Sequence, residues 1–190
     1  MAGFLAGDPA SHTPMKPITP ILMALLGFAG GCATQQASVP AAPARTEVVF
    51  DHPEKFADVR DNISPTDRGR DEILARIRSF LVEHTTPMVP DGFKLTIVFT
   101  DIHLAGDFEP WRGAQWDGVR IIKNIYPPNF QFSYTVTDPQ GRVVKEGKED
   151  LRDLDFMTTG LQYPTDDALH YEKDVLDDWA HTTLRDIKKA

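Results

Sequence analysis

Two stretches of the chain alternate apolar and polar residues with the period of a β-strand. The odd-numbered positions between residues 93 and 99 are all apolar, as are the even-numbered positions between residues 130 and 136. A period of two places these side chains on one face, so both stretches predict strands with one buried face. After the first stretch the apolar phase switches to Ile102 and Leu104, which predicts a bulge or bend near Thr100.

Three shorter segments complete the predicted strands. Residues 47–50 and 119–123 are short and rich in β-branched residues, and residues 142–149 follow a turn signal at Asp138–Gly141. Proline at the second and glycine at the fourth position of that signal favour a type I turn. We therefore expect residues 142–149 to return as the hairpin partner of strand 130–136.

Two segments show the period of a helix. Ser64–Asp67 has the form of a capping box with proline at the first helical position, so a helix should begin there and stop at about Thr85. The apolar positions of this helix are Ile73, Leu74, Ile77, Phe80 and Leu81. A final helix should open at Pro164–Asp167. Its apolar stripe consists of Leu169, Leu176, Trp179, Ala180, Thr183 and Ile187.

The predicted element order is β-α-β-β-β-β-α, which indicates the α+β class. A run of strands flanked by two helices favours a single antiparallel sheet with both helices packed on one face. The other face of the sheet would then be solvated or covered by loops.

An apolar run, Ile21–Gly31, ends directly before Cys32, the one cysteine of the sequence. Its 11 residues fit the core of a secretory signal and fall short of the roughly 20 that a bilayer-spanning helix needs. Ala29–Cys32 resembles the lipobox of bacterial lipoproteins, in which the cysteine thiol receives a lipid. We therefore expect residues 1–31 to be a removed signal segment that truly starts at Met15, and Cys32 to be the lipidation site.

The residues after Cys32 are rich in alanine and proline and poor in large apolar groups. Such a segment cannot offset the entropy of ordering, so residues 32–46 should form a flexible tether and residues 47–190 a single domain. Ala33 is not the aspartate that retains many lipoproteins at the inner membrane. We expect anchoring in the outer membrane, with the domain facing the periplasm.

The formal net charge of −8 argues against a nucleic-acid partner and leaves the lipid on Cys32 as the link to the membrane. With that thiol lipidated, no disulfide is available and the core alone must hold the fold. The sequence contains no glycine-rich phosphate loop and no zinc-type pairing of cysteine with histidine. We therefore expect neither a cofactor nor a metal.

Four ionisable side chains lie within a short segment that could support metal or general-base chemistry: Asp101, His103, Asp107 and Glu109. A zinc or calcium site needs three or more converging ligands, and the last two follow a break at Gly106. The structural alternative, which we favour, has Asp101 capping turn amides, His103 at a sheet edge and Gly106 in a turn with positive φ.

A loop rich in glycine and acids follows, and its tryptophans and arginine match the composition of interface hot spots. The candidate interaction surface comprises Asp107, Glu109, Trp111, Arg112, Trp116 and Tyr126. In the alternative arrangement, Trp111 folds back as a lid over the sheet, with an arginine on its face or paired with Glu109.

Three blocks of the sequence are distinctive in combination: Thr100–Arg112, Arg120–Pro128 and Tyr171–Trp179. Together they resemble the proteobacterial domain-of-unknown-function 3016 family over about Val48–Leu184. The resemblance implies an exported envelope protein. It carries over no catalytic residue, cofactor or partner.

These features predict a cell-envelope lipoprotein that is not an enzyme and acts as a binding or assembly module, with an envelope protein as partner. Two alternatives stay open. The first is a metal-dependent hydrolase that uses Asp101, His103, Asp107 and Glu109. The second is a carrier of a lipid or hydrophobic peptide, which predicts an apolar cavity in place of a packed core.

Replacing the cysteine tests the anchor. Cys32→Ser should yield an unprocessed or soluble protein without lipid, because a serine hydroxyl cannot form the thioether. Palmitate labelling and membrane fractionation of the variant beside the native protein measure this. Labelling at the native level would contradict lipidation at Cys32.

Overall fold

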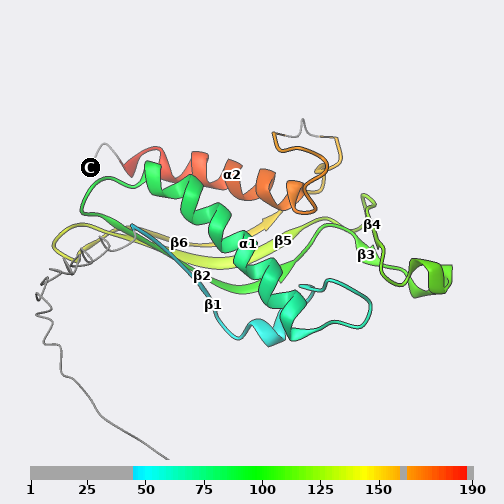
Figure 1. Cartoon of the computed structure of the whole chain (residues 1–190). Coiled ribbons are helices and arrows are strands. Elements are labelled where there is room, and N and C mark those ends of the chain that lie inside the picture. Colours follow the sequence, from blue (N-terminus) through cyan, green and yellow to red (C-terminus); the bar gives the residue numbers. More distant parts are fainter. Residues whose placement is uncertain (1–44, 159–161, 188–190) are drawn as a thin grey trace, which may run out of the picture. The chain divides into compact units, whose positions relative to one another are not determined.

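The computed structural model describes residues 45–158 and 162–187. Four strands form the main sheet in the order β1-β2-β5-β6 (Figure 1). Their bounds are Thr46–Phe50 for β1, Lys94–His103 for β2, Asn129–Thr137 for β5 and Val143–Arg152 for β6. The predicted signal segment, Cys32 and nearly all of the predicted tether lie outside the described residues.

The main sheet is mixed, and the prediction of a purely antiparallel sheet was wrong. β2 pairs antiparallel with β5, and β5 with β6, but β1 pairs in parallel with β2. The helix α1 (Asp67–Thr85) connects β1 to β2 and packs on β1. A crossover helix of this kind returns the chain to the end of the sheet where β1 began, so β2 runs in the same direction.

The first helix ends where the sequence predicts and begins slightly later. Its N-cap is Thr66, whose hydroxyl accepts a hydrogen bond from the Gly69 amide at 2.9 Å, so the expected cap at Ser64 was wrong. The helix ends at Thr85, and the Thr85 hydroxyl lies 2.9 Å from that of Thr46 at the start of β1.

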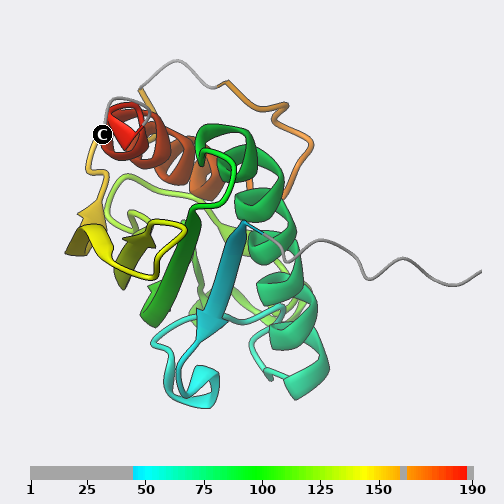
Figure 2. The same cartoon turned by 90° about the vertical axis from the view of Figure 1, so that its left-hand side faces the viewer.

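The second helix, α2 (His170–Leu184), starts later than the predicted opening at Pro164–Asp167. The residues before it form turns instead, because the Asp167 carboxylate accepts a hydrogen bond from the Leu169 amide at 2.9 Å. Both helices cover the same face of the sheet, as predicted (Figure 2). Within the described residues, neither helix combines the length and apolarity needed to cross a bilayer.

The core lies between that face of the sheet and the two helices. The pairing of β2 with β5 shifts between Phe99 and Asp101, which makes Thr100 the extra residue of a bulge and confirms the prediction. The bulge keeps both Phe99 and Ile102 fully buried. Burying a side chain of this size contributes about 1.5–3 kcal/mol to the stability of the fold. The core consists of buried residues from the sheet and both helices.

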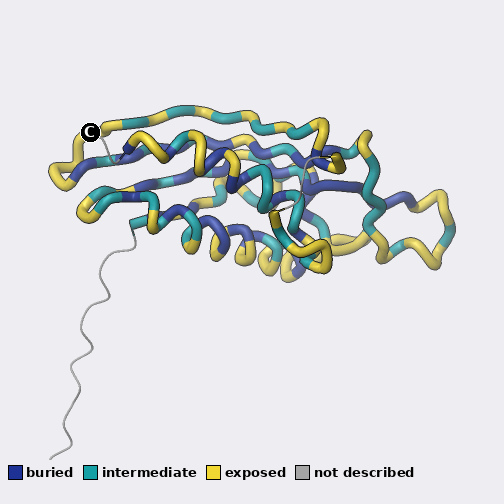
Figure 3. Tube along the Cα trace, turned by 90° about the horizontal axis from the view of Figure 1, so that it is seen from above, coloured by how far each residue is buried: buried dark blue, intermediate teal, exposed yellow. Residues whose placement is uncertain are grey.

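The residues of β2 and β5 that alternate with the buried ones are intermediate or exposed, and β6 is a largely exposed edge (Figure 3). No residue of β6 is buried, and its lysines and glutamates discourage pairing with a further strand. The turn predicted at Asp138–Gly141 is present, since the Gly141 amide donates to the Asp138 carbonyl at 2.9 Å.

A second sheet of two short strands, β3 (Asp107–Phe108) and β4 (Arg120–Ile121), extends beyond the main sheet (Figure 1). The strand predicted at 119–123 is thus reduced to β4. We call residues 107–126 the ribbon. Gly106 opens it with a φ of 78°, and a Cβ atom there would lie 2.8 Å from the Ile121 carbonyl oxygen, so only glycine fits without strain.

Candidate functional site

The tip of the ribbon exposes large apolar side chains to solvent. Trp111 is 71% exposed at this tip, where Trp116 and Val119 are also exposed, and Ile125, between β4 and β5, is 66% exposed. The guanidinium of Arg112 lies 5.9 Å from the centre of the Trp116 ring. Trp111 therefore does not fold back as a lid over the sheet, and the alternative that placed it there was wrong.

Behind this tip, Glu109 is buried and joins both arms of the ribbon. Its carboxylate accepts hydrogen bonds from Lys123 and Arg112, and from the Tyr126 hydroxyl at 3.1 Å. The hydrogen bonds from Lys123 and Arg112 lower the pKa of Glu109 to about 2, against the effect of burial. Glu109 is only 1% exposed, so it is not itself part of the exposed surface and instead holds Arg112, Lys123 and Tyr126 in place.

The base of the ribbon depends on a second buried carboxylate, Asp58. Arg60 donates to it at 2.6 Å and Arg120 at 2.7 Å, and Nε2 of His103 lies 3.5 Å away. Burial alone would raise the pKa of Asp58, but hydrogen bonds and charges from Arg120 and Arg60 outweigh it and hold the pKa below its usual range. Arg60 also donates to Asp107 at 2.8 Å.

These contacts account for the four residues considered as metal ligands. Asp101 caps backbone amides as expected, accepting from Ala57 at 2.7 Å and from Ile102 at 2.9 Å. His103 faces Asp58 at the end of the interior strand β2, so its predicted position at a sheet edge was wrong. Asp107 and Glu109 are held by separate cations. Across residues 45–158 and 162–187, no group of three or more histidine, cysteine or acidic side chains could hold a metal.

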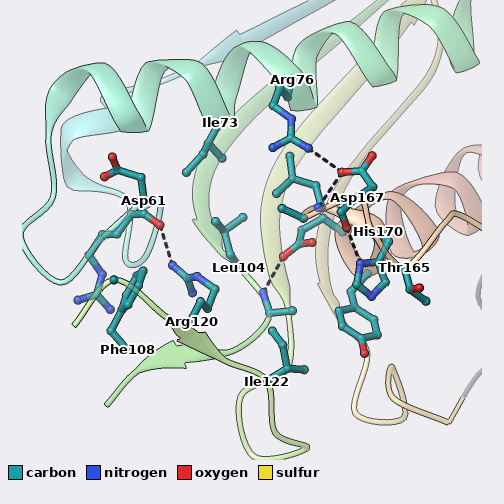
Figure 4. A pocket seen from close by; sticks show the side chains of 17 residues that line it. Asp61, Ile73, Arg76, Leu104, Phe108, Arg120, Ile122, Thr165, Asp167 and His170 are labelled. Carbon is teal, nitrogen blue, oxygen red and sulfur yellow. Dashed lines mark hydrogen bonds and ion pairs between the residues drawn. The ribbon is translucent and has the colours of Figure 1, made fainter. Parts of the chain in front are cut away.

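A cavity of about 410 Å³ lies beside the base of the ribbon (Figure 4). Its walls come from α1, the end of β2, the ribbon and the start of α2; among the labelled side chains are Ile73, Leu104, Phe108 and Ile122. Glu172, in the first turn of α2, also lines it and is 2% exposed.

The sequence contained a signal for Glu172 that the predictions did not use. Glu172 falls three positions after Leu169 and four before Leu176, on the apolar stripe of the last helix. An acid on such a stripe is unusual, because acidic side chains are rarely buried without a partner. Asp58, in contrast, lies in a loop with no periodic pattern, and nothing in the sequence indicated its burial.

The comparisons with known proteins gave one finding. A family model described as "Protein of unknown function (DUF3016)" matches residues 44–182. Neither a curated protein nor a solved structure matched the chain.

The low pKa of Glu109 makes a prediction about pH and stability. A folded-state pKa near 2 lies below the usual value of 4.5, so the ionised carboxylate stabilises the fold above pH 4.5 and this contribution is lost as the pH falls toward 2. Glu109→Gln should therefore be less stable than the native protein at pH 6, and the difference should narrow below pH 4.5. Urea unfolding at pH 6, 4.5 and 3.5 measures it.

Glu146→Gln is the matched control, because it removes one negative charge from an exposed position on β6. A Glu109→Gln protein as stable as the native one at pH 6 would contradict the role of Glu109 as the link between the arms of the ribbon.

Proposed function

The chain belongs to the DUF3016 family, and from this premise we propose that it is a lipid-anchored binding module of the cell envelope. The lipid sits on Cys32 in the outer membrane, and the domain faces the periplasm and captures an envelope protein through the tip of the ribbon. The observation that carries the proposal is that Trp111 is exposed on a ribbon whose position is held by the buried carboxylates of Asp58 and Glu109.

Exposed apolar residues on the ribbon are the main support for a protein partner. Scattered single exposures are ordinary, but the ribbon gathers four large ones: Trp111, Trp116, Val119 and Ile125. Tryptophan is enriched among interface hot spots, which supports a role for the exposed Trp111 in binding. The expected partner presents an apolar depression that accepts the Trp111 side chain.

The fixed base of the ribbon strengthens this proposal. Glu109 holds both arms together, and Asp58 holds the ribbon to the rest of the domain through Arg120. A surface already held in its binding shape loses less conformational freedom on association, which improves affinity without further contacts.

The two alternative functions gain less support. The four residues of the proposed hydrolase each have separate structural partners within the domain. A lipid carrier needs an apolar cavity in place of the core, whereas the sheet and helices share a continuous cluster of buried side chains. The cavity beside the ribbon is small and has charged residues in its walls.

Trp111→Ala tests the partner surface. Because the side chain is 71% exposed, its loss should change the free energy of unfolding by no more than about 0.5 kcal/mol. Loss of a hot-spot tryptophan should weaken partner binding by about 2 kcal/mol or more, which is at least tenfold. Capture from crosslinked envelopes, quantified beside thermal melts of the same variant, measures both effects.

Leu154→Ala is the matched control, since Leu154 is 65% exposed and lies outside the ribbon. It should leave capture at the native level. Equal capture by the two variants would refute the ribbon as the partner surface. Arg112→Glu is a poor probe, because it would set a second negative charge against the buried Glu109.

A further inference from the structure

Glu172 is a buried carboxylate with one oxygen that has no hydrogen-bond partner among the described residues. One oxygen, Oε1, accepts a hydrogen bond from the Ala105 amide at 2.7 Å. The other, Oε2, has no hydrogen-bond partner in the described part of the chain, although it is fully buried. An unsatisfied buried polar atom is costly, and such atoms are rare in folded proteins. Glu172 is also one of the residues that line the cavity.

The electrostatics of Glu172 agree with an open site. No ion pair among the described residues includes Glu172. Burial raises its pKa, despite hydrogen bonds from the Ala105 amide and from its own backbone and despite the more distant charges of Arg120 and His170. A cation that entered the cavity would supply the partner that the fold lacks.

The arginines in the cavity wall are already occupied. Arg76 donates to Asp167 at 2.6 Å, and Arg120 donates to Asp58 through both terminal nitrogens. Arg60 shares Asp58 with Arg120. An anionic ligand would have to share an arginine with one of these aspartates, so the paired arginines attract it less than free arginines would.

Apolar side chains form much of the remaining wall (Figure 4). They include Ile73, Leu104, Phe108, Ile122 and Leu169. The volume of about 410 Å³ falls within the roughly 300–1,000 Å³ of small-molecule sites. The cavity therefore combines an apolar body of modest size with one unpartnered acceptor.

We propose that this cavity binds a small molecule that carries an ammonium group on an apolar body. The ammonium pairs with the carboxylate of Glu172, and the apolar body packs against Leu104, Phe108 and Ile122. The ribbon contributes part of the wall of this site, but the proposal rests on Glu172 and the cavity and does not depend on the protein partner proposed above.

Three probes of equal length and different head group test the ligand class. These are hexylammonium, 1-hexanol and hexanoate, titrated at pH 7 into the full lipidated protein held in lipid nanodiscs, with empty nanodiscs as the blank for partition into lipid. Hexylammonium should bind at one site per chain and at least tenfold more tightly than 1-hexanol. Hexanoate should not bind measurably.

Two variants locate the site. Glu172→Gln keeps an acceptor for the Ala105 amide and removes the negative charge, so it should weaken hexylammonium binding at least tenfold. Ala168 lines the cavity from an exposed position, and Ala168→Phe should narrow the cavity and weaken binding without removing a core contact. Circular dichroism shows whether each variant is folded. If Glu172→Gln does not fold, the binding measured with Ala168→Phe decides the location of the site.

The proposal is overturned if the native protein binds none of the probes, or binds 1-hexanol or hexanoate as tightly as hexylammonium. It is also overturned if every folded variant binds hexylammonium with native affinity.

Discussion

The arrangement of the ribbon and the cavity depends on the ion pairs of the buried Asp58 carboxylate with Arg60 and Arg120. The backbone of Asp58 pairs with the end of β2. The Asp58 amide donates to the Ile102 carbonyl, and the Asp58 carbonyl accepts from the Leu104 amide. Its side chain receives Arg60 and Arg120. Removing one partner of a buried ionic network of this kind costs about 3–5 kcal/mol, since the remaining charge is left uncompensated.

The two proposed sites share the structural elements that Asp58 holds together. Arg120 belongs to β4 of the ribbon, lies 4.8 Å from the ring centre of Phe108 and also lines the cavity. Arg120 thus connects the ribbon both to Asp58 and to the wall of the cavity. The two buried acids of the ribbon region differ from Glu172 in one respect: Asp58 and Glu109 have cationic partners, whereas Glu172 has none among the described residues.

Local periodicity was sufficient for the elements that form the core. The alternation around Leu95 and Phe132 predicted β2 and β5, and the change of phase after Thr100 predicted the bulge, because the side-chain direction along a strand depends only on residue number. The end of α1 at Thr85 was also predicted from local sequence, because Pro87 cannot continue a helix. The family assignment also rested on the sequence alone.

The direction of β1, the exposure of Trp111 and the pairing of Asp58 were decided by the tertiary structure. The five residues of β1 are too few to indicate a direction by their pattern, and the crossover through α1 sets it. Asp58 and Arg120 lie 62 residues apart, so their contact exists only after the chain has folded. For Glu172 the sequence showed an acid on an apolar stripe, but the unpartnered oxygen became visible only when Ala105 and the walls of the cavity were in place.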